Sequence, residues 1–488
     1  MKCDITIENE LFKAANKLRG KIPPADYKFY VLPLLFIRYL SIRYEIKQSG
    51  GEINETNEVL YVPYECSWKY IVENINDENI ARIIDEVMSG LEERHDKLQG
   101  VLPKIYSESN IPTEVLRDLI YLFSNEEITI NEINNIDFLG RVYEYFISNF
   151  ASTEGNRGGE FFTPSSVVNL LVEMLEPMEG IVYDPACGTG GMFIQSAKYN
   201  RYNKVSFVGQ EYNDKTIKLA KMNAILHGIN PIIKQGDTLL NDQFKGLKAD
   251  TIISNPPFNM KDWGAEYLDD NDPRLIGGIN PNNANYMWIQ HFLYHLSENG
   301  NAGFVIANGA LTSSTYSDKD IRKRLLDMNL IDCVVQLPDK MFFGTSIPSA
   351  LIFISKTRMG TSLFSNREGK ILFVNASNKG KLVSKKQRVF TKEDINEISK
   401  AYQDFKRGKI RNYNELGISA VTSIEDVIRN DYKLMPSLYT GIEKTEYNEE
   451  LNNKKISELS ATLKEQFEKS IKLQCKIIES LVEINETN

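Results

Sequence analysis

Between about residues 160 and 376, short runs of β-branched and aromatic residues alternate with longer segments of helical spacing. The runs are 181–183, 205–208, 251–253, 304–306, 333–335, 351–354 and 372–374. Strands that are separated by helices are typical of a parallel sheet with helices on both faces. We therefore predict a doubly wound α/β fold with a mostly parallel sheet. The last three runs have no long helix between them, so we expect an antiparallel edge.

The segments on either side of this predicted sheet have helical patterns. At 488 residues the chain is too long for one compact core. Residues 27–40 are apolar almost all round, which predicts a buried helix. We predict an N-terminal helical domain at 1–150, an α/β domain at 151–415 and a C-terminal helical region at 416–488. A stripe from Ile456 to Ile471 in that region could pack on the protein's own body or on a partner helix.

Composition and charge limit the setting and the partners. No apolar run approaches the roughly 20 residues of a membrane span, and residues 1–4 have no apolar signal core. The five cysteines are scattered without a CxxC pair, so we expect a reduced, cytoplasmic protein and no membrane. The net charge is −9, whereas a protein that binds DNA mainly through its own surface is usually basic. If DNA is the substrate, a local basic stripe or another subunit must supply most phosphate contacts.

A glycine-rich run, Asp184-Pro-Ala-Cys-Gly-Thr-Gly-Gly191, follows the first predicted strand and precedes a helix. Glycines there allow a sharp turn and a close approach of the backbone to a ligand. The run matches neither the phosphate-binding loop G-x-x-x-x-G-K-[ST] nor G-x-G-x-x-G. Asp184 would repel a pyrophosphate and suits a ligand with an ammonium group, such as the amino-acid part of S-adenosylmethionine. The alternative is a tight strand-to-helix turn without a ligand.

Two further acidic residues end the next two predicted strands. Glu211 lies 20 to 30 residues after the glycine-rich turn, where a carboxylate can bind ribose hydroxyls. Asp237 follows the run 232–235 and could accept a hydrogen bond from the amine of a cofactor adenine. The alternatives are a solvated glutamate and an aspartate that only stabilises a turn.

The tetrapeptide Asn255-Pro256-Pro257-Phe258 directly follows the apolar run 249–254. Two prolines keep the chain extended and remove two backbone donors. The Asn255 side-chain oxygen and the Pro256 carbonyl could together accept both hydrogens of an exocyclic amine, while Phe258 stacks on its ring. The alternative is a strand that a proline pair merely terminates.

In this order, the four strand-end signals resemble N6-adenine DNA methyltransferases, and most closely the modification subunit of type I restriction-modification systems. The family's motif ahead of the glycine-rich loop is similar to Glu160, Phe161, Phe162, Thr163 and Pro164, with Ser165 after them, and implies contact with the methionine end of the cofactor. The resemblance implies cofactor binding by Asp184, Ala186, Gly188, Thr189, Gly190, Gly191, Glu211 and Asp237, and catalysis by Asn255, Pro256, Pro257 and Phe258. The motif order resembles the gamma arrangement, and the similarity covers residues 10 to about 380.

The resemblance also implies partners. S-adenosylmethionine is the expected methyl donor, and the adenine must leave the DNA duplex to reach the tetrapeptide. Residues 151–415 would be the catalytic domain, and 416–488 would serve subunit assembly. We expect a separate specificity subunit, with two copies of this chain for each copy of it. Whether a restriction subunit, a nuclease and translocase, joins the complex stays open.

Several alternatives remain at this point. A self-sufficient amino-methyltransferase would need a recognition domain of its own, and an inert DNA-binding assembly subunit would not need the intact tetrapeptide. Cytosine N4 is an exocyclic amine too, although the asparagine and the resemblance favour adenine. His291 and His295 are spaced as a metal pair, but the H-E-x-x-H glutamate is absent, so we predict a structural role and no metal.

Overall fold

The computed structural model describes residues 4–20, 22–51, 58–126, 128, 138–154, 163–199, 204–342, 347–384, 387–409, 414–441 and 449–486. Residues 4–440 belong to one compact unit, and residues from Gly441 onward form a second. Each unit is therefore described by itself.

A ten-stranded sheet is the centre of the larger unit, with strand order β11-β12-β8-β6-β7-β5-β4-β1-β2-β3. Its strands are β1 (Gly180–Asp184), β2 (Val205–Glu211), β3 (Ile232–Gln235), β4 (Ala249–Ser254), β5 (Leu296–Ala307), β6 (Ile331–Gln336), β7 (Ser349–Ser355), β8 (Lys370–Asn375), β11 (Asn414–Glu415) and β12 (Ser419–Ser423). A separate hairpin pairs β9 (Lys381–Ser384) with β10 (Gln387–Val389). Every strand run named from the sequence lies inside one of these strands, and the doubly wound fold is confirmed.

The expected antiparallel edge is present, although β12 and β11 form it beside β8, and one further antiparallel strand lies inside the sheet. Strand β7 is antiparallel to both β5 and β6 and lies between them, inside the sheet, whereas β6 and β8 are parallel. The connection 337–348 contains no helix among its described residues. A parallel return is usually made by a helix that crosses the face of the sheet, and this connection, which has none among its described residues, reverses the chain instead.

The sheet's outer edge also corrects the predicted domain limits. Strand β12 pairs antiparallel with β8, and β11 with β12, so the predicted boundary between 415 and 416 falls inside a hairpin of the sheet. The compact unit continues to Thr440. At the other limit, helix α7 (Phe138–Glu154) runs across the predicted boundary between 150 and 151.

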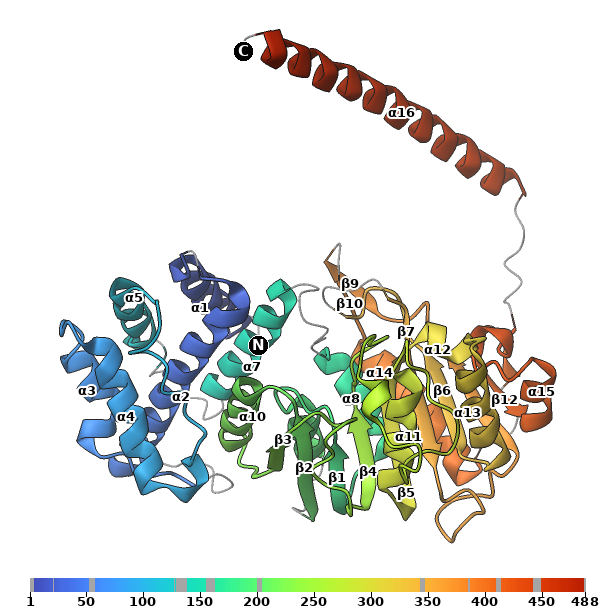
Figure 1. Ribbon diagram of the computed structural model, residues 1–488, viewed down its shortest axis with the longest axis horizontal. Helices are drawn as coiled ribbons and strands as arrows, with labels where there is room; N and C mark the ends of the chain where they lie inside the picture. The colour runs from blue at the N-terminus through green and yellow to red at the C-terminus, as the bar shows by residue number, and fades with distance from the viewer. Residues whose placement is uncertain are drawn as a thin grey trace. The chain divides into compact units, whose positions relative to one another are not determined.

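Helices cover both faces of the sheet, because alternate strand residues point to opposite sides (Figure 1). Val182, Ile253 and Phe353 pack with helices α8 (Ser165–Leu175), α9 (Gly191–Tyr199) and α14 (Lys392–Arg407). Their strand neighbours Tyr183 and Ile252 pack on the other side, with α11 (Asn285–His295), α13 (Tyr316–Asp327) and α15 (Ile424–Arg429). The short helix α12 (Asn308–Thr312) follows β5. The result is a three-layer α/β/α arrangement.

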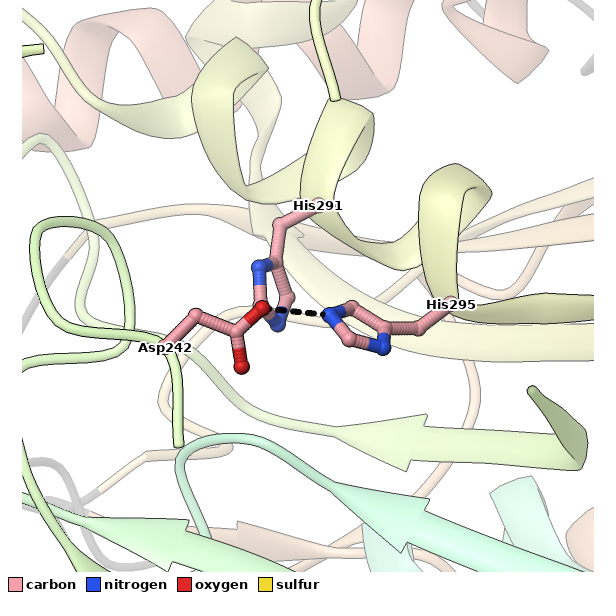
Figure 2. Close-up of side chains that lie close together, drawn as sticks. All are labelled: Asp242, His291 and His295. Atoms are coloured by element: carbon pink, nitrogen blue, oxygen red, sulfur yellow. Dashed lines mark hydrogen bonds and ion pairs between the residues drawn. The ribbon is translucent and has the colours of Figure 1, made fainter. Parts of the chain in front are cut away.

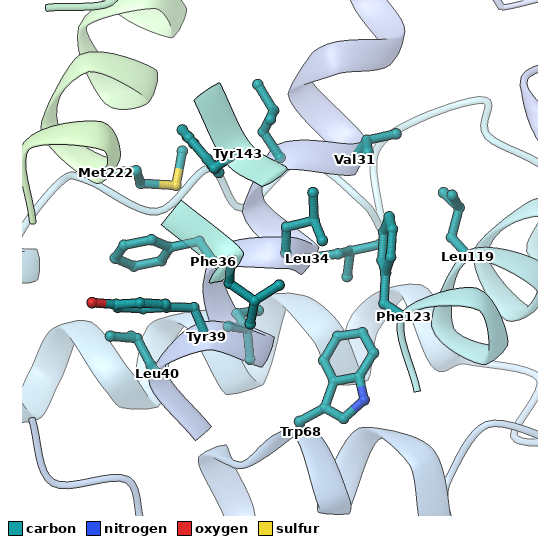
Figure 3. Packing of buried hydrophobic residues seen from close by; sticks show 14 of the residues in the cluster. Val31, Leu34, Phe36, Tyr39, Leu40, Trp68, Leu119, Phe123, Tyr143 and Met222 are labelled. Atoms are coloured by element: carbon teal, nitrogen blue, oxygen red, sulfur yellow. The ribbon is translucent and has the colours of Figure 1, made fainter. Parts of the chain in front are cut away.

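The N-terminal part is helical, as predicted, with α1 (Asp4–Leu18), α2 (Pro24–Gln48), α3 (Trp68–Glu73), α4 (Ile80–Arg94), α5 (Thr113–Phe123) and α7. Helix α2 contains the predicted 27–40 segment, and it begins at the proline pair. Its side chains from Val31 to Phe36 form the middle of an aromatic and aliphatic core, which Figure 3 shows from close by. The same core includes Met222 and Leu226 of α10 (Asp214–Leu226), a helix of the sheet region. The helical part is therefore packed on the sheet region through α10.

The second unit contains α16 (Glu449–Glu486), so the predicted C-terminal helix is confirmed. Within this helix Leu459, Leu463 and Phe467 are each more than half exposed. Among the helices that the structure describes, none has the length and apolar character that crossing a membrane requires.

Candidate active site

The carboxyl ends of β1, β2, β3 and β4 border one cavity of about 700 Å³. Among the residues predicted from the sequence, those that line it are Ala186, Gly188, Thr189, Glu211, Asp237, Asn255, Pro257 and Phe258. Residues from Ala186 to Phe258, 72 positions apart in the chain, thus meet at the edge of the sheet where α/β proteins bind ligands.

The glycine-rich loop turns from β1 into α9 through left-handed backbone conformations. Gly188 has a φ of 51° and Gly190 a φ of 79°, which residues with a side chain rarely adopt. The Cys187 amide donates to the Gln210 carbonyl at 3.1 Å, which ties the loop to β2. A Cβ atom at Gly188 or Gly191 would meet no atom within 4 Å. The loop therefore keeps open space in front of its backbone, as a bound cofactor requires.

Asp184 does not line the cavity, in contrast to its predicted contact with an ammonium group. Its side chain is 1% exposed, and its Oδ1 accepts from the Ser254 hydroxyl at 2.7 Å and from the Ala186 amide at 3.1 Å. Burial raises the pKa of this carboxyl from its ordinary 3.8 to about 7, against the two hydrogen bonds that lower it. The Asp184 side chain therefore connects the glycine-rich loop to β4.

We expect Asp184→Asn to be more stable than the natural protein at pH 8. Between pH 3.8 and about 7 the folded state keeps the Asp184 proton and the unfolded state releases it, so this group lowers stability as the pH rises through that window. Asparagine keeps the acceptor oxygen and removes the ionisation, and the gain at pH 8 should be about 1–4 kcal/mol. Urea unfolding at pH 5 and pH 8 measures it. An equal loss of stability at both pH values would contradict this account.

Glu211, the last residue of β2, is hydrogen-bonded to the glycine-rich loop. Its Oε2 accepts from the Gly188 amide at 3.1 Å, and its Oε1 accepts from the Asn213 amide at 2.9 Å. The carboxylate therefore joins the glycine-rich loop to the start of α10 and also borders the cavity. The alternative of a solvated glutamate is wrong, because the side chain is 9% exposed, and the predicted ribose contact fits this position.

Asp237 lies at the end of β3, where its Oδ1 caps a turn by accepting from the Leu239 and Leu240 amides at 2.9 and 3.1 Å. The same turn is held from behind by Arg274, which donates to the Leu239 carbonyl at 2.6 Å. The side chain is half-buried and borders the cavity. A well-fixed carboxylate at this end of the cavity is what the predicted adenine contact needs.

The tetrapeptide follows β4 directly, as predicted. The Asn255 Nδ2 atom donates to the Thr163 hydroxyl at 2.9 Å, which orients the carboxamide so that its oxygen lies on the other side of the group. Phe258 is 8% exposed and packs edge-to-face on Phe342, with ring centroids 5.7 Å apart. Pro257 lines the cavity beside them. The structure thus brings Thr163 of the preceding motif to the tetrapeptide.

The rest of that preceding motif is only partly described. Glu160, Phe161 and Phe162 lie outside the described residues. Pro164 precedes α8, and Ser165 is its first residue. The predicted contact of this motif with the methionine end of the cofactor stays a prediction.

Hydrogen bonds fix the loop that follows the tetrapeptide. The Asn259 amide donates to the Asn285 side chain at 3.0 Å, and the indole of Trp263 donates to the Asn280 carbonyl at 3.0 Å. The Gln290 side chain accepts from two further loop amides, at 2.8 and 3.0 Å. These contacts connect the loop to α11.

His291 and His295 lie beside Asp242 in the interior, as Figure 2 shows. The Nε2 atom of His295 is 2.9 Å from Asp242 Oδ2, and its Nδ1 is 3.0 Å from the Leu247 carbonyl. Both neighbours are hydrogen-bond acceptors, and the ring is held between them. Although burial alone would raise the pKa of Asp242, its hydrogen bond with His295 leads the interactions that lower it to about 2.

A divalent cation could replace the proton between His295 and Asp242, but His291 argues against one. Its Nδ1 accepts from the Arg274 guanidinium at 3.3 Å, which leaves the ring proton on Nε2, beside the Tyr183 hydroxyl. Burial lowers the pKa of His291 well below its ordinary value, so the ring is neutral. The geometry favours the predicted structural role: the cluster links α11 to the turn that carries Asp237.

Sequence reasoning missed several cavity-lining residues. Lys28, Leu32 and Ile147 come from the helical N-terminal part, and Tyr212 and Trp288 come from the sheet region. Tyr212 had a signal, because it directly follows the strand-end acid Glu211. The three N-terminal residues had none, because nothing in the sequence shows which helix packs on which.

Comparisons with known proteins agree with this geometry. The family described as N-6 DNA Methylase matches residues 134–449, and the HsdM N-terminal domain matches residues 7–123. The chain is 37% identical to the methylase subunit of the type I restriction enzyme MjaIX of Methanocaldococcus jannaschii, over 97% of this chain and 90% of that protein. It is also 37% identical to the HindI methylase subunit of Haemophilus influenzae, over 82% of this chain and 92% of the relative.

A solved structure is similar over most of the chain. The methyltransferase subunit of a type I restriction-modification system from Streptococcus thermophilus has a TM-score of 0.76 and 25% identity. The similarity covers 89% of this chain and 99% of that one. It therefore includes the helical N-terminal part as well as the sheet.

Proposed function

The chain belongs to the N-6 DNA methylase family as the methylase subunit of a type I restriction-modification system, and we propose which of its residues carry out adenine N6 methylation. The observation that carries the assignment is the single cavity in which the glycine-rich loop, Glu211, Asp237 and Asn255 meet. No one of these signals is specific alone, but their convergence at one sheet edge is what a cofactor and a base together require.

We propose that this cavity binds S-adenosylmethionine, which supplies an electrophilic methyl group on sulfur when bound. The open space before Gly188 and Gly191 admits the amino-acid part, Glu211 receives the ribose hydroxyls, and Asp237 receives the adenine amine. Thr163 lies beside Asn255 at the end where methyl transfer takes place. Asp184 contributes indirectly, by holding the loop in this shape.

The catalytic step depends on how an exocyclic amine is held. The lone pair of adenine N6 is delocalised into the ring, so the amine is a poor nucleophile. The Asn255 oxygen and the Pro256 carbonyl accept its two hydrogens and favour tetrahedral geometry at nitrogen, which localises the lone pair toward the methyl group. Preorganised acceptors and positioning supply most of the rate enhancement. Phe258 contacts the face of the base, which has left the duplex.

We propose that a specificity subunit selects the DNA site, with two copies of this chain for each copy of it. The net charge of −9 supports a partner that supplies most phosphate contacts. The exposed apolar side chains of α16 suit assembly through the C-terminal region. Participation of a restriction subunit and a cytoplasmic location stay predictions.

The test is transfer of a tritiated methyl group to DNA by the chain alone, by the specificity subunit alone, and by the two together. We expect transfer only with both, and N6-methyladenine as the labelled nucleoside after digestion and chromatography. Transfer by the chain alone would identify a self-sufficient enzyme, and no transfer with both would identify an inert subunit. Label in N4-methylcytosine would contradict the choice of adenine.

A further inference from the structure

Helices α2 and α10 lie side by side and run in the same direction. The Lys215 ammonium group at the start of α10 lies 5.4 Å from the ring centroid of Phe29, near the start of α2. Further along, the Tyr39 hydroxyl of α2 donates to the carbonyl of Leu226, the last residue of α10, at 3.3 Å. Two contacts about ten residues apart on each helix fix their register. Residue 28 therefore lies level with the first turn of α10, which begins at Asp214, three residues after Glu211.

The helical part is fixed in this position by more than apolar packing. Glu144 of α7 accepts from the Lys198 ammonium group of α9 at 2.8 Å and pairs with His227 at 2.7 Å. Although burial alone would raise the pKa of Glu144, its bonds to His227 and Lys198 lower it to about 2. Figure 3 shows Met222 of α10 among the side chains of the helical core. The helices that contribute Lys28, Leu32 and Ile147 to the cavity are therefore held in place by ion pairs as well as by apolar packing.

One of the residues that this part of the chain contributes to the cavity, Lys28, is a cation. Lys28 and Leu32 of α2 border it together with Gly188, Thr189 and Glu211. Among the described residues, the charged side chains that line the cavity are the acids Glu211, Asp237 and Asp262 and the lysines Lys28 and Lys261. Lys261 follows the catalytic tetrapeptide and is on the side of the base. Lys28 is the lysine that the helical N-terminal part contributes to the cavity, and its ammonium group lies 5.1 Å from the centroid of the Phe29 ring.

Only one group of S-adenosylmethionine is anionic. Its ammonium and sulfonium groups are cations, its ribose and adenine are neutral, and its carboxylate needs a cation or N–H donors. A carboxylate side chain cannot serve it, and ammonium–carboxylate hydrogen bonds are about twice as strong as neutral ones. We propose that Lys28 of the N-terminal helical part binds the carboxylate of the cofactor's amino-acid portion, an inference that rests on the proposed use of S-adenosylmethionine.

The consequence is that the N-terminal part takes part in cofactor binding and is more than an assembly module. Binding of the cofactor and docking of α2 on α10 stabilise each other, because linked equilibria are reciprocal. A cofactor that lacks the carboxylate loses this link and keeps its other contacts.

The test compares S-adenosylmethionine with its decarboxylated form, which differs from it only by the carboxylate, in calorimetric titrations of the full chain. We expect Lys28→Ala to weaken binding of S-adenosylmethionine about tenfold and to leave binding of the decarboxylated form unchanged. Lys28→Arg keeps the cation and should retain most of the affinity. Lys47→Ala, an exposed lysine in the last turn of the same helix, is the matched control and should bind both ligands normally.

The outcomes separate the inference from its premise. If the natural chain binds neither ligand, the proposed cofactor is wrong. If it binds S-adenosylmethionine and Lys28→Ala binds it equally well, the role of Lys28 is wrong. Equal weakening of both ligands by Lys28→Ala contradicts the carboxylate contact. If Lys28→Ala is unstable without ligand, the affinity of Lys28→Gln decides: normal binding of S-adenosylmethionine overturns the proposal, and selective loss supports it.

Discussion

Asn255→Ala is expected to lower the rate of methyl transfer by at least about 100-fold, the usual loss when one preorganised polar contact to a transition state is removed. The alanine removes the side-chain acceptor for the amine, whereas the Pro256 carbonyl remains. Affinity for S-adenosylmethionine should change little, because Glu211, Asp237 and the glycine-rich loop are untouched. Single-turnover transfer with the specificity subunit present and a cofactor titration measure the two quantities separately.

Two further variants sharpen this prediction. Asn255→Asp keeps an acceptor oxygen but cannot donate to Thr163, so it should retain partial activity. Thr163→Val removes the 2.9 Å hydrogen bond that orients the carboxamide and should lose less activity than Asn255→Ala. Equal loss of transfer and cofactor binding in Asn255→Ala would show that the residue supports the cavity and is not catalytic.

The fold was largely predictable because alternation of strand and helix patterns is a local property of the chain. The order of strands is not local. The insertion of β7 between β5 and β6 depends on a short connection and on pairing between distant segments. Strand β12 was missed because Ser419–Ser423 is short and half polar, and only its pairing with β8 identifies it as part of the sheet.

The candidate site was predictable to the extent that its residues follow strands. Glu211, Asp237 and Asn255 end consecutive strands, and parallel strands place their carboxyl ends at one edge. Asp184 also ends a strand, but its side chain does not line the cavity. It is held away from the cavity because it accepts a hydrogen bond from the Ser254 hydroxyl. Lys28 carries no signal at all, since its position depends on the packing of α2 on α10.

Stability of the sheet depends on a second buried group, Asp332 of β6. Its side chain is fully buried, and its Oδ1 lies 3.2 Å from Arg358 Nε and 3.0 Å from Arg367 Nε. Its Oδ2 accepts from the Tyr402 hydroxyl of α14 at 2.8 Å. One carboxylate thus compensates two buried guanidinium groups and joins β6 to the connection before β8 and to α14. Both guanidinium groups also donate to backbone carbonyls, Arg358 to Ile331 at 2.6 Å and Arg367 to Thr357 at 2.9 Å.

Asp332→Ala is therefore expected to lower the free energy of unfolding by about 3–5 kcal/mol, because it leaves two buried cations uncompensated. Urea unfolding, with hydrogen exchange of the β6 amides as a local readout, measures the loss. Glu86→Ala is the control: it removes the Arg82–Glu86 pair, which is shorter at 2.8 Å but has side chains 74% and 60% exposed. Exposed pairs contribute at most about 1 kcal/mol, so this variant should remain close to the natural protein.

A similar loss in both variants would mean that burial of Asp332 does not decide the effect. Asp332→Asn keeps an acceptor without the charge, and a loss between those of the two alanine variants would assign the difference to charge compensation.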